Sequence, residues 1–453
     1  MPFIPHTAED ERRMLAAMGL SDRAALFAEI PADLLAPPLQ LPEGESEMQV
    51  RRHMAACARR DEVELCFLGA GAYDHHIPAA VWELAGRGEF MTAYTPYQAE
   101  ASQGTLQVIY EFQSMMAQLV ALDVCNASVY DAGSGLAEAV LMAIRAQRRG
   151  GARQVLMPRS VHPLYREAVA SIVGVQGITL IDVAVDAEGR IDQAALDRQR
   201  TSQAAALVLP QPNYWGVIDE VDALTDWAHE AGMLVIAQVN PLALSLLSPP
   251  GDWGQRGADI CVGEAQVFGI PLSSGGPYCG FIACRMDLVR QLPGRLIGRT
   301  LDLDGKPGFT LTLQAREQHI RRAKATSNIC TNQGLAMTAA TIHVSLLGSE
   351  GLRRVAASCH QRLQQLLQLL QAYGVLPVHA APHFHECALH LPVAAAAVIE
   401  RMAARGILAG ADMSPDYPEL GHALLVCTTE KHELADLQTY AATLAVAIEE
   451  CCA

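Results

Sequence analysis

Four polar residues follow apolar, strand-like runs of the chain and could line one binding site: Ser134, His162, Asn240 and Gln266. Ser134 lies in a Gly/Ser loop that opens a helix, where free backbone N–H groups and the helix dipole can bind a phosphate. An ordinary capped turn is the alternative for this loop. The flat ring of His162 could stack on a planar ligand, or the residue could cap a helix. Asn240 and Gln266 carry amides, which are neither basic nor nucleophilic.

The segment around Gln266 resembles the turn that holds the cofactor lysine in large α/β enzymes that use pyridoxal phosphate (PLP), with Gln266 in place of the lysine. Such an enzyme needs an amine to hold the aldehyde and to carry protons, and an amide can do neither. Asn240 stands where these enzymes place an aspartate that keeps the pyridine nitrogen protonated. We therefore expect a vestigial cofactor pocket at these residues, in a chain that does not run PLP chemistry alone.

Lysine is scarce in this chain, so every amine that could hold PLP can be named. The lysines are Lys306, Lys324 and Lys431. Lys306 lies in a turn-like run and Lys431 opens the last helix. Lys324 lies in a polar, arginine-rich segment that has the character of a site. A self-sufficient PLP enzyme that uses Lys324 is therefore one alternative for this chain.

Two further segments carry more polar groups than a linker requires. The first is a Pro/Gly-bounded loop at residues 94–104, and the second, at residues 316–328, carries four cations suited to carboxylate or phosphate recognition. A solvated loop and an exposed charged helix are the plain alternatives. The candidate residues in these segments are Tyr94, Thr95, Tyr97, Gln98, Ser102, Gln103, Arg316, Arg321, Arg322 and Lys324.

The composition excludes several classes of protein. The net charge of -16 is spread without blocks of like charge, which argues against a surface for nucleic acid or an anionic membrane. The sequence has neither a long uncharged apolar run nor the pattern of a signal peptide. Its 12 cysteines are scattered without a CxxC pair, which is typical of reduced thiols. We expect a cytoplasmic protein with neither nucleic acid nor membrane as a partner.

A histidine-rich stretch near the C-terminus imitates a metal site. It holds His383, His385, Glu386, Cys387 and His390. Residues 384–391 alternate like a half-buried strand, and the spacings typical of zinc ligands are absent. We expect no metal here.

The elements that position these residues are short apolar strands that alternate with helices. Between residues 126 and 285, nearly continuous apolar runs of strand length indicate a mostly parallel sheet covered on both faces. Binding sites gather at the carboxyl ends of such strands. From residue 332 onward, a long helix from Gly351 to Tyr373 and further strands and helices indicate a smaller α+β domain. We expect an N-terminal arm at 1–60, a large α/β domain at 61–330 and a small C-terminal domain at 331–453.

Several motifs together resemble glycine decarboxylase, the P-protein of the glycine cleavage system, and more narrowly the first subunit of its two-subunit form. The motifs are Gly69-Ala-Gly-Ala-Tyr-Asp-His75, Tyr94-Thr-Pro-Tyr-Gln98, Ser102-Gln-Gly104, Gly275-Gly-Pro277 and Arg316-Glu-Gln-His-Ile-Arg-Arg-Ala-Lys-Ala-Thr-Ser-Asn-Ile-Cys-Thr-Asn332. The resemblance spans nearly the whole chain, and the last motif is long enough to be highly specific.

The resemblance implies the aminotransferase-like fold of PLP-dependent enzymes (fold type I), shared by both subunits of the two-subunit form. It places the PLP lysine in the second subunit, while the first has glutamine at the matching position. Gln266 follows this pattern. Asn240 departs from it mildly, because an aspartate is expected there.

The resemblance also implies a reaction and its partners. Glycine loses its carboxylate as CO2 on PLP, and the aminomethyl group passes to the lipoyl arm of H-protein. The expected partners are a lysine-bearing second subunit, in αβ pairs that assemble as α2β2, and lipoylated H-protein. We expect the two polar segments to reach across the subunit interface and to close the site, recognise glycine or position the lipoyl arm. A catalytically inactive homologue that acts as a scaffold or regulator is the remaining alternative.

Overall fold

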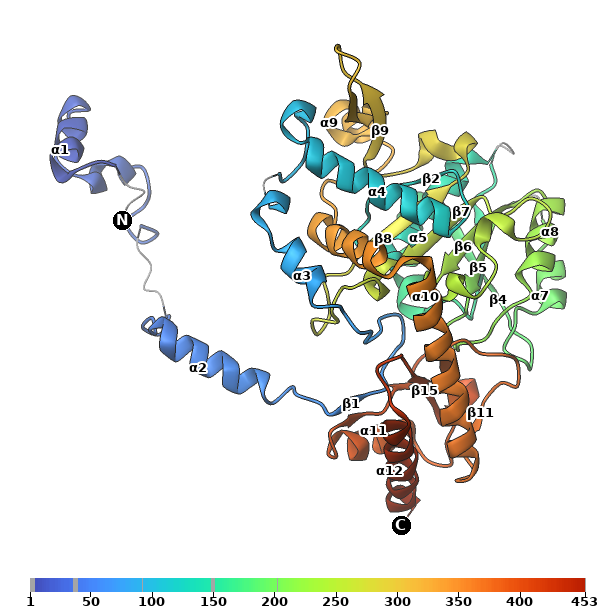
Figure 1. Ribbon diagram of the computed structural model, residues 1–453. Helices are drawn as coiled ribbons and strands as arrows, with labels where there is room; N and C mark the ends of the chain where they lie inside the picture. Colours follow the sequence, from blue (N-terminus) through green and yellow to red (C-terminus); the bar gives the residue numbers. More distant parts are fainter. Residues whose placement is uncertain (1–4, 36–39, 92, 148–150, 202, 453) are drawn as a thin grey trace. The chain divides into compact units, whose positions relative to one another are not determined.

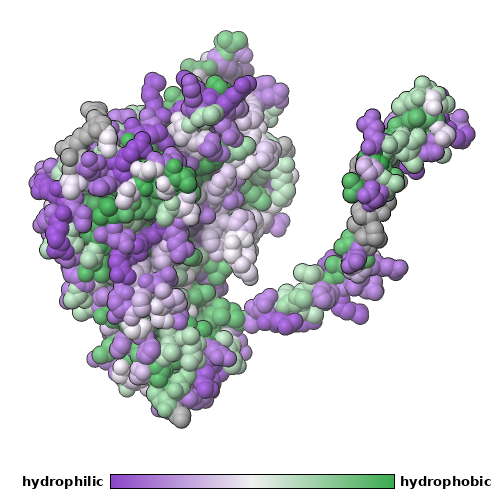
Figure 2. Space-filling model, turned by 180° about the vertical axis from the view of Figure 1, so that it is seen from behind, coloured by the Kyte–Doolittle hydropathy of each residue, from purple (hydrophilic) through white to green (hydrophobic). Residues whose placement is uncertain are grey.

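The structure is a computed structural model that describes residues 5–35, 40–91, 93–147, 151–201 and 203–452. The chain forms two compact units, Met1–Glu62 and Val63–Ala453. The first unit holds α1 (Ala8–Ala17), the 3-10 helix η1 (Arg23–Phe27) and α2 (Glu47–Ala58). Thr7 and Ser46 begin the two α-helices with capping boxes. Neither α-helix has a buried residue, and Figure 2 shows apolar side chains on the surface of this unit, so these two helices form no buried core within the described part of the unit.

A seven-stranded sheet forms the centre of the second unit (Figure 1). Strands β4, β3, β5, β6 and β7 pair in parallel, and β8 pairs antiparallel with both β7 and β2. The prediction of a mostly parallel sheet is therefore confirmed. In spatial order the strands are β2 (Val124–Cys125), β8 (Gly280–Cys284), β7 (Ile260–Glu264), β6 (Leu234–Val239), β5 (Ala204–Gln211), β3 (Gln154–Pro158) and β4 (Thr179–Val183).

Both faces of this sheet are buried. Strand β5 shows why: Leu207 and Leu209 belong to one hydrophobic core, whereas Ala206 and Val208 belong to the core on the opposite face. Helices α4 (Gln103–Leu119), α7 (Gln193–Arg198) and α8 (Val221–Glu230) contribute to the first core, and α5 (Ala132–Ala146) and α6 (Pro163–Val173) to the second. The carboxyl ends of the parallel strands thus become the open edge at which a site can form.

A smaller antiparallel sheet lies in the C-terminal part of the chain. Its order is β11 (Leu376–Pro377), β12 (Glu386–His390), β15 (Ala423–Cys427) and β14 (Ala411–Asp412). Helices α11 (Ala395–Ala403) and α12 (Leu434–Cys452) pack on it. Strand β1 (Leu65–Cys66) pairs in parallel with β13 (Ile407–Leu408), and Phe67 joins the same core. The start of the second unit therefore packs with its end.

The prediction of a half-buried strand at residues 384–391 is wrong. Glu386 through Leu389 are all buried in β12, and of this strand only His390 is exposed. Cys387 and Leu389 face the core shared with α11 and α12, whereas Ala388 faces a second cluster around Trp215 and Tyr417. Because protein covers both faces of the strand, the alternation of residue types does not become an alternation of exposure.

Helix α10 (Gly334–Gln371) links the two sheets. It begins well before Gly351, where the sequence predicted the long helix, and Gly348 interrupts it with φ 60° and ψ -177°. Such angles are essentially restricted to glycine. Ala336 and Met337 pack in a core of the large sheet, whereas Leu363 packs in the C-terminal core. Figure 1 shows the bend that lets one helix serve both cores.

The remaining elements surround the large sheet. Strands β9 (Leu296–Leu301) and β10 (Pro307–Thr312) form a separate antiparallel hairpin. The shorter helices are α3 (Ala80–Ala85), η2 (Gly88–Phe90), η3 (Ala99–Ala101), η4 (Gly174–Gln176), η5 (Ala243–Ser245), η6 (Pro250–Asp252), η7 (Ala265–Val267), η8 (Met286–Gln291), η9 (Gln314–Arg316), α9 (Gln318–Arg321), η10 (Arg322–Lys324) and η11 (Pro418–Leu420). Within the described ranges, none of the helices is both long and apolar enough to cross a bilayer.

Candidate functional site

A cavity opens at the carboxyl ends of strands β3, β5, β6 and β7. His162, Asn240 and Glu264 line it from three of the loops or strand ends there, and His385 and Glu386 line it from the C-terminal part of the chain. The free space within it is about 40 Å³. This is room for about three water molecules. Side chains therefore fill most of the position at which this class of fold binds its ligands.

Gln266 is committed to hydrogen bonds with the backbone. Its Nε2 group donates to the carbonyl oxygens of Tyr73, at 3.0 Å, and Ile270, at 2.8 Å. Its Oε1 atom accepts from the N–H of Tyr73 at 2.9 Å. The side chain is 2% exposed, and its hydrogen bonds link the loop that contains Tyr73 to the turn after β7. An amide that both donates and accepts suits this role, and a lysine could not accept the third bond.

Asn240 and His162 line the cavity but are also held by neighbouring groups. The Nδ2 group of Asn240 donates to Nε2 of His385 at 3.1 Å, and its Oδ1 accepts from the N–H of Leu242 at 3.0 Å. His162 caps α6. Its ring stacks on Tyr165 with the centroids 4.5 Å apart, and burial lowers its pKa. One face of the His162 ring is therefore used within the protein.

The start of α5 carries the Gly/Ser loop of Ser134. The Ser134 N–H donates to Oδ1 of Asp131 at 2.7 Å, and the two residues form a capping box. The N–H of Ala132 donates to Oε2 of Glu264 at 3.0 Å. Oε1 of Glu264 accepts from the N–H groups of Gln266, at 3.1 Å, and Cys279, at 2.8 Å. Burial raises the pKa of Glu264 to about 7, although these three bonds lower it.

Glu386 is the second buried carboxyl group of the cavity. Its Oε2 atom accepts from the hydroxyl of Tyr73 at 2.6 Å and its Oε1 from the N–H of Ala70 at 2.7 Å. Burial raises the pKa of Glu386 to about 7, against the lowering effect of both bonds. Burial also raises the pKa of Tyr73 well above its usual value. The cavity therefore holds two buried carboxyl groups, Glu264 and Glu386, which repel an anionic ligand when they are ionised.

These residues do not fit PLP. None of the described residues that line the cavity is a lysine, so no amine is present to hold the aldehyde. Asn240 offers a neutral amide where a pyridine nitrogen needs a carboxylate. The space of about 40 Å³ does not admit a substituted ring with a phosphate.

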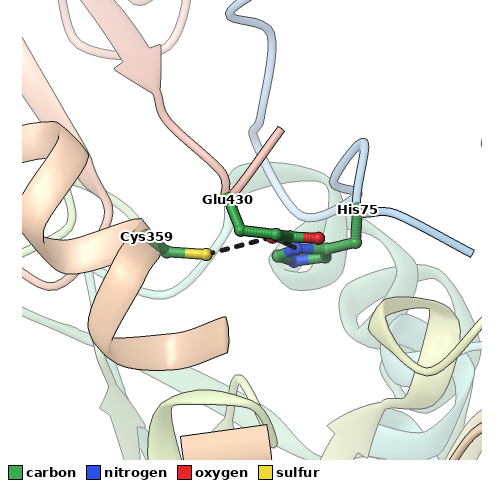
Figure 3. A group of neighbouring side chains, drawn as sticks. All are labelled: His75, Cys359 and Glu430. Carbon is green, nitrogen blue, oxygen red and sulfur yellow. Dashed lines mark hydrogen bonds and ion pairs between the residues drawn. The ribbon is translucent and has the colours of Figure 1, made fainter. Parts of the chain in front are cut away.

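A second buried cluster lies beside this cavity and is shown in Figure 3. Among the described residues, His75, Cys359 and Glu430 form a group of three metal-ligand types whose ligand atoms lie within 4.8 Å of one another. His75 Nδ1 lies 2.8 Å from Oε2 of Glu430, and the Cys359 thiol donates to the same oxygen at 3.3 Å. Burial alone would raise the pKa of Glu430, but the hydrogen bond and charge of His75 outweigh it and lower the pKa to about 2. These bonds tie α10 to two distant loops, and the absence of a metal site stays a prediction.

The loop at residues 94–104 presents some side chains to solvent and others to the protein. Tyr94 is 83% exposed and Tyr97 is 53% exposed. Gln98 precedes η3, and Ser102 precedes α4 without a side-chain cap. Gln103 makes paired bonds with the backbone of Phe309, donating at 2.9 Å and accepting at 2.8 Å. The end of this loop is thus anchored on the β9–β10 hairpin.

The second polar segment consists of short turns in place of one charged helix. Arg316 donates to the carbonyls of Leu313 and Gly294, and burial lowers its pKa. Arg321, Arg322 and Lys324 are exposed. Lys324 lines a separate surface hollow with Arg316 and Arg321, and it does not line the cavity of His162 and Asn240.

Arg295 joins the two polar segments. Its Nη2 group donates to the hydroxyl of Thr95 at 3.3 Å and to the carbonyl of Cys330 at 2.7 Å. Its guanidinium lies 5.9 Å from the ring centre of Tyr97, whose ring contacts His319 at 5.4 Å. We call these five residues the Arg295 cluster. Of these five residues, Arg295 lines a cavity of about 440 Å³, together with Tyr94 and Asn332, and this size is in the usual range for small-molecule sites.

Comparison with known proteins identifies the family. The family model described as "Glycine cleavage system P-protein" matches residues 1–444. The chain belongs to the glycine cleavage system P-protein family. Among curated relatives of this P-protein chain, "Probable glycine dehydrogenase (decarboxylating) subunit 1" of Thioalkalivibrio sulfidiphilus is 57% identical, with 99% of this chain and 100% of the relative covered. The protein of the same name from Methylococcus capsulatus is 56% identical, with 99% and 100% covered.

Solved structures agree with this family and define the fold of the P-protein chain. A crystal structure of glycine decarboxylase (P-protein) in inhibitor-bound form has a TM-score of 0.90 and 40% identity, with 99% of this chain and 100% of that chain covered. A sphingosine-1-phosphate lyase from Burkholderia pseudomallei, 15% identical, has a TM-score of 0.68, with 93% and 94% covered. The fold is fold type I of the PLP-dependent enzymes, as the resemblance implied.

Sequence reasoning missed three residues of this site. Arg295 lies in an unremarkable run before β9, and its role depends on two segments about 200 and 35 residues away. Glu264 ends an apolar strand, and Glu386 lies in the stretch dismissed as a false metal site. An acid within an otherwise apolar strand was the available signal, because a buried carboxyl group requires partners.

Proposed function

We propose that this chain is the non-PLP-binding subunit of glycine dehydrogenase (decarboxylating). The whole enzyme decarboxylates glycine and transfers the aminomethyl group to the lipoyl arm of H-protein. The cofactor belongs to a lysine-bearing second subunit, which pairs with this chain as αβ and assembles as α2β2. The relatives named subunit 1, which match this chain over their full length, support the reaction. We place the enzyme in the cytoplasm.

One observation supports the proposal that the partner subunit, and not this chain, holds PLP. Gln266, in the position of a cofactor lysine, makes three hydrogen bonds with the backbone of Tyr73 and Ile270. A side chain with this structural task leaves the carbanion chemistry of PLP to a group on another chain. The same reasoning argues against a self-sufficient enzyme based on Lys324, which is exposed and separate from the cavity.

We further propose that the Arg295 cluster and the two polar segments form this chain's wall of the active site. Tyr94 is largely exposed although it borders a cavity of about 440 Å³. Arg295 holds Thr95 of the first segment and the carbonyl of Cys330, which lies just after the second segment, so we propose that it is a positioning residue for both stretches. Exposed, preorganised polar groups around a hollow are suited to closing a site that a second chain completes.

The test combines the purified chain with its lysine-bearing partner and PLP. We expect exchange of labelled bicarbonate into glycine from the mixture and none from either chain alone, and no borohydride-trapped adduct on Lys324 of this chain. An adduct on Lys324, or exchange by this chain alone, would overturn the proposal.

The Arg295→Met variant tests the proposed wall. Loss of charge-assisted hydrogen bonds is worth about 1.5–3 kcal/mol each, so we expect at least a tenfold lower exchange rate in the assembled enzyme. Arg299→Met, at an exposed position on strand β9, which begins directly after Arg295, is the control and should change the rate less than twofold. Full activity of Arg295→Met at unchanged thermal stability would favour a scaffold or regulator. KM and kcat measured separately distinguish lost binding of glycine from lost positioning.

A further inference from the structure

The buried end of α5 shows an arrangement that the proposed function does not use. Three backbone N–H groups converge there from separate elements: Ala132 at the first turn of α5, Gln266 in the turn after β7, and Cys279 just before β8. Converging N–H groups at a helix start form a ready-made cradle for an oxyanion. In this chain all three donate to the carboxylate of one residue, Glu264.

We propose that Glu264 is a built-in occupant of an anion cradle and that it excludes phosphate-bearing ligands from this pocket. Its carboxylate takes the N–H groups that a phosphate would need. The residue is therefore a specificity determinant in its own right, separate from the replacement of the cofactor lysine by Gln266. The proposal rests on the proposed function, in which the cofactor belongs to the partner, and it explains what keeps the cofactor out of this chain.

Charge strengthens the exclusion. Asp131 caps the same helix and is a second acidic group beside the cradle, where it raises the pKa of Glu264. Burial raises the pKa of Glu264 to about 7. Among the described residues that line the cavity, none is a lysine or an arginine. A phosphate would bring further negative charge to a place that already holds two carboxyl groups, with nothing cationic to offset it.

Space leads to the same conclusion. Glu264 lines the cavity together with Tyr165 and His162, whose rings stack on each other. The remaining space of about 40 Å³ cannot hold a phosphate ester beside the carboxylate. A lysine introduced at position 266 would leave this obstruction in place. Two features therefore oppose binding of the cofactor in this pocket, and a lysine at position 266 would not by itself make room for the phosphate.

The experiment measures binding to the full-length chain without its partner, so it can fail while the proposed function stands. Binding of inorganic phosphate is measured by calorimetry. Binding of pyridoxal phosphate and of pyridoxal is measured by equilibrium dialysis. For the wild type and Gln266→Lys, we expect no phosphate binding at millimolar concentration and equal binding of the two pyridoxal compounds within twofold. For Glu264→Ala, we expect phosphate to bind at least tenfold more tightly than to the wild type. We also expect this variant to bind pyridoxal phosphate at least tenfold more tightly than pyridoxal.

Glu386→Ala is the matched control. It removes a buried carboxyl group with a similarly raised pKa from the same cavity, but one whose partners are Ala70 and Tyr73 and not the start of α5. It should bind phosphate as the wild type does, within twofold. Equal gains in both variants would overturn the proposal, because any loss of charge would then suffice. So would a tenfold preference of Gln266→Lys for pyridoxal phosphate over pyridoxal.

A measurement on the unaltered chain guards against misfolding of the variants. Crystals of the wild type soaked in phosphate should show the Glu264 carboxylate on the N–H groups of Ala132 and Cys279, and no anion there. A phosphate bound to those N–H groups, with Glu264 displaced, would overturn the proposal.

Discussion

The carboxyl group of Glu386 makes the stability of this protein depend on pH in a predictable direction. We consider the variant Glu386→Gln, which keeps the shape of the side chain and removes its charge. The amide oxygen can accept from the N–H of Ala70, as Oε1 does now at 2.7 Å. The amide nitrogen would face the hydroxyl of Tyr73, which can turn to accept where it now donates at 2.6 Å. The amide can therefore keep a hydrogen bond to each of the two groups that the carboxyl group now contacts.

The magnitude follows from the raised pKa of Glu386. Burial moves this pKa from the usual 4.5 to about 7 in the folded chain. Between these values the folded chain holds a proton that the unfolded chain has released, so the free energy of unfolding falls as the pH rises through this window. At about 1.4 kcal/mol for each pKa unit, the wild type loses about 3 kcal/mol from this group by the alkaline end of the window. Glu386→Gln does not undergo this loss.

The assay is urea unfolding of wild type and variant between about pH 5 and about pH 8. We expect similar stability at the acidic end and a variant more stable by about 3 kcal/mol at the alkaline end. Glu264, with a similarly raised pKa, contributes equally to both proteins and cancels in the difference. Glu167→Gln, at an exposed position, is the control and should leave the profile unchanged. Parallel profiles for wild type and Glu386→Gln would refute the reasoning.

Two further predictions concern stability. Gly348→Ala should lower the free energy of unfolding by about 1–3 kcal/mol because its φ of 60° and ψ of -177° are suited only to glycine. Gly174→Ala, with helical angles and open space around its Cβ position, should change it by less than about 1 kcal/mol, and equal losses would contradict this account. Glu430→Ala should cost about 3–5 kcal/mol, because it breaks the buried pair with His75. A double-mutant cycle with His75→Ala measures this coupling, and additive losses would show that the pair contributes nothing.

Much of the fold was predictable from local patterns. The apolar runs at β3 and at β5 to β8 were found in place because strands buried on both faces need apolar residues at nearly every position. The run at β4 was also found, although this edge strand has exposed residues. The helix predicted from Gly351 was too short because Gly348 interrupts the helical pattern, while the cores on either side keep the chain helical. The pairing of β1 with β13 depends on contact between residues about 340 positions apart, which local pattern does not encode.

The site was only partly predictable. The residue types of Asn240 and Gln266 predict a pocket without the groups that PLP requires. Of the four residues expected to line it, His162 and Asn240 do so, whereas Ser134 and Gln266 are not among its described lining residues. The partners of Asn240 and Gln266 were not predictable, because His385 and Tyr73 reach them from distant parts of the chain. Arg295 went unnoticed for the same reason, and the roles of the two polar segments remain predictions.

Helix α10 has a consequence for how the second unit can be taken apart. Its residues from Ala336 to Cys359, on both sides of Gly348, pack in a core of the large sheet, and its last turns, from Leu363, pack in the C-terminal core. A fragment that begins near residue 331, or just after Gly348, would therefore carry away apolar helix residues that belong to the other core. Phe67 adds a second connection, from the start of the unit to the C-terminal core. The two sheets therefore cannot be exchanged between related proteins by a single cut in the chain without breaking a core. For the same reason, we expect them to unfold together.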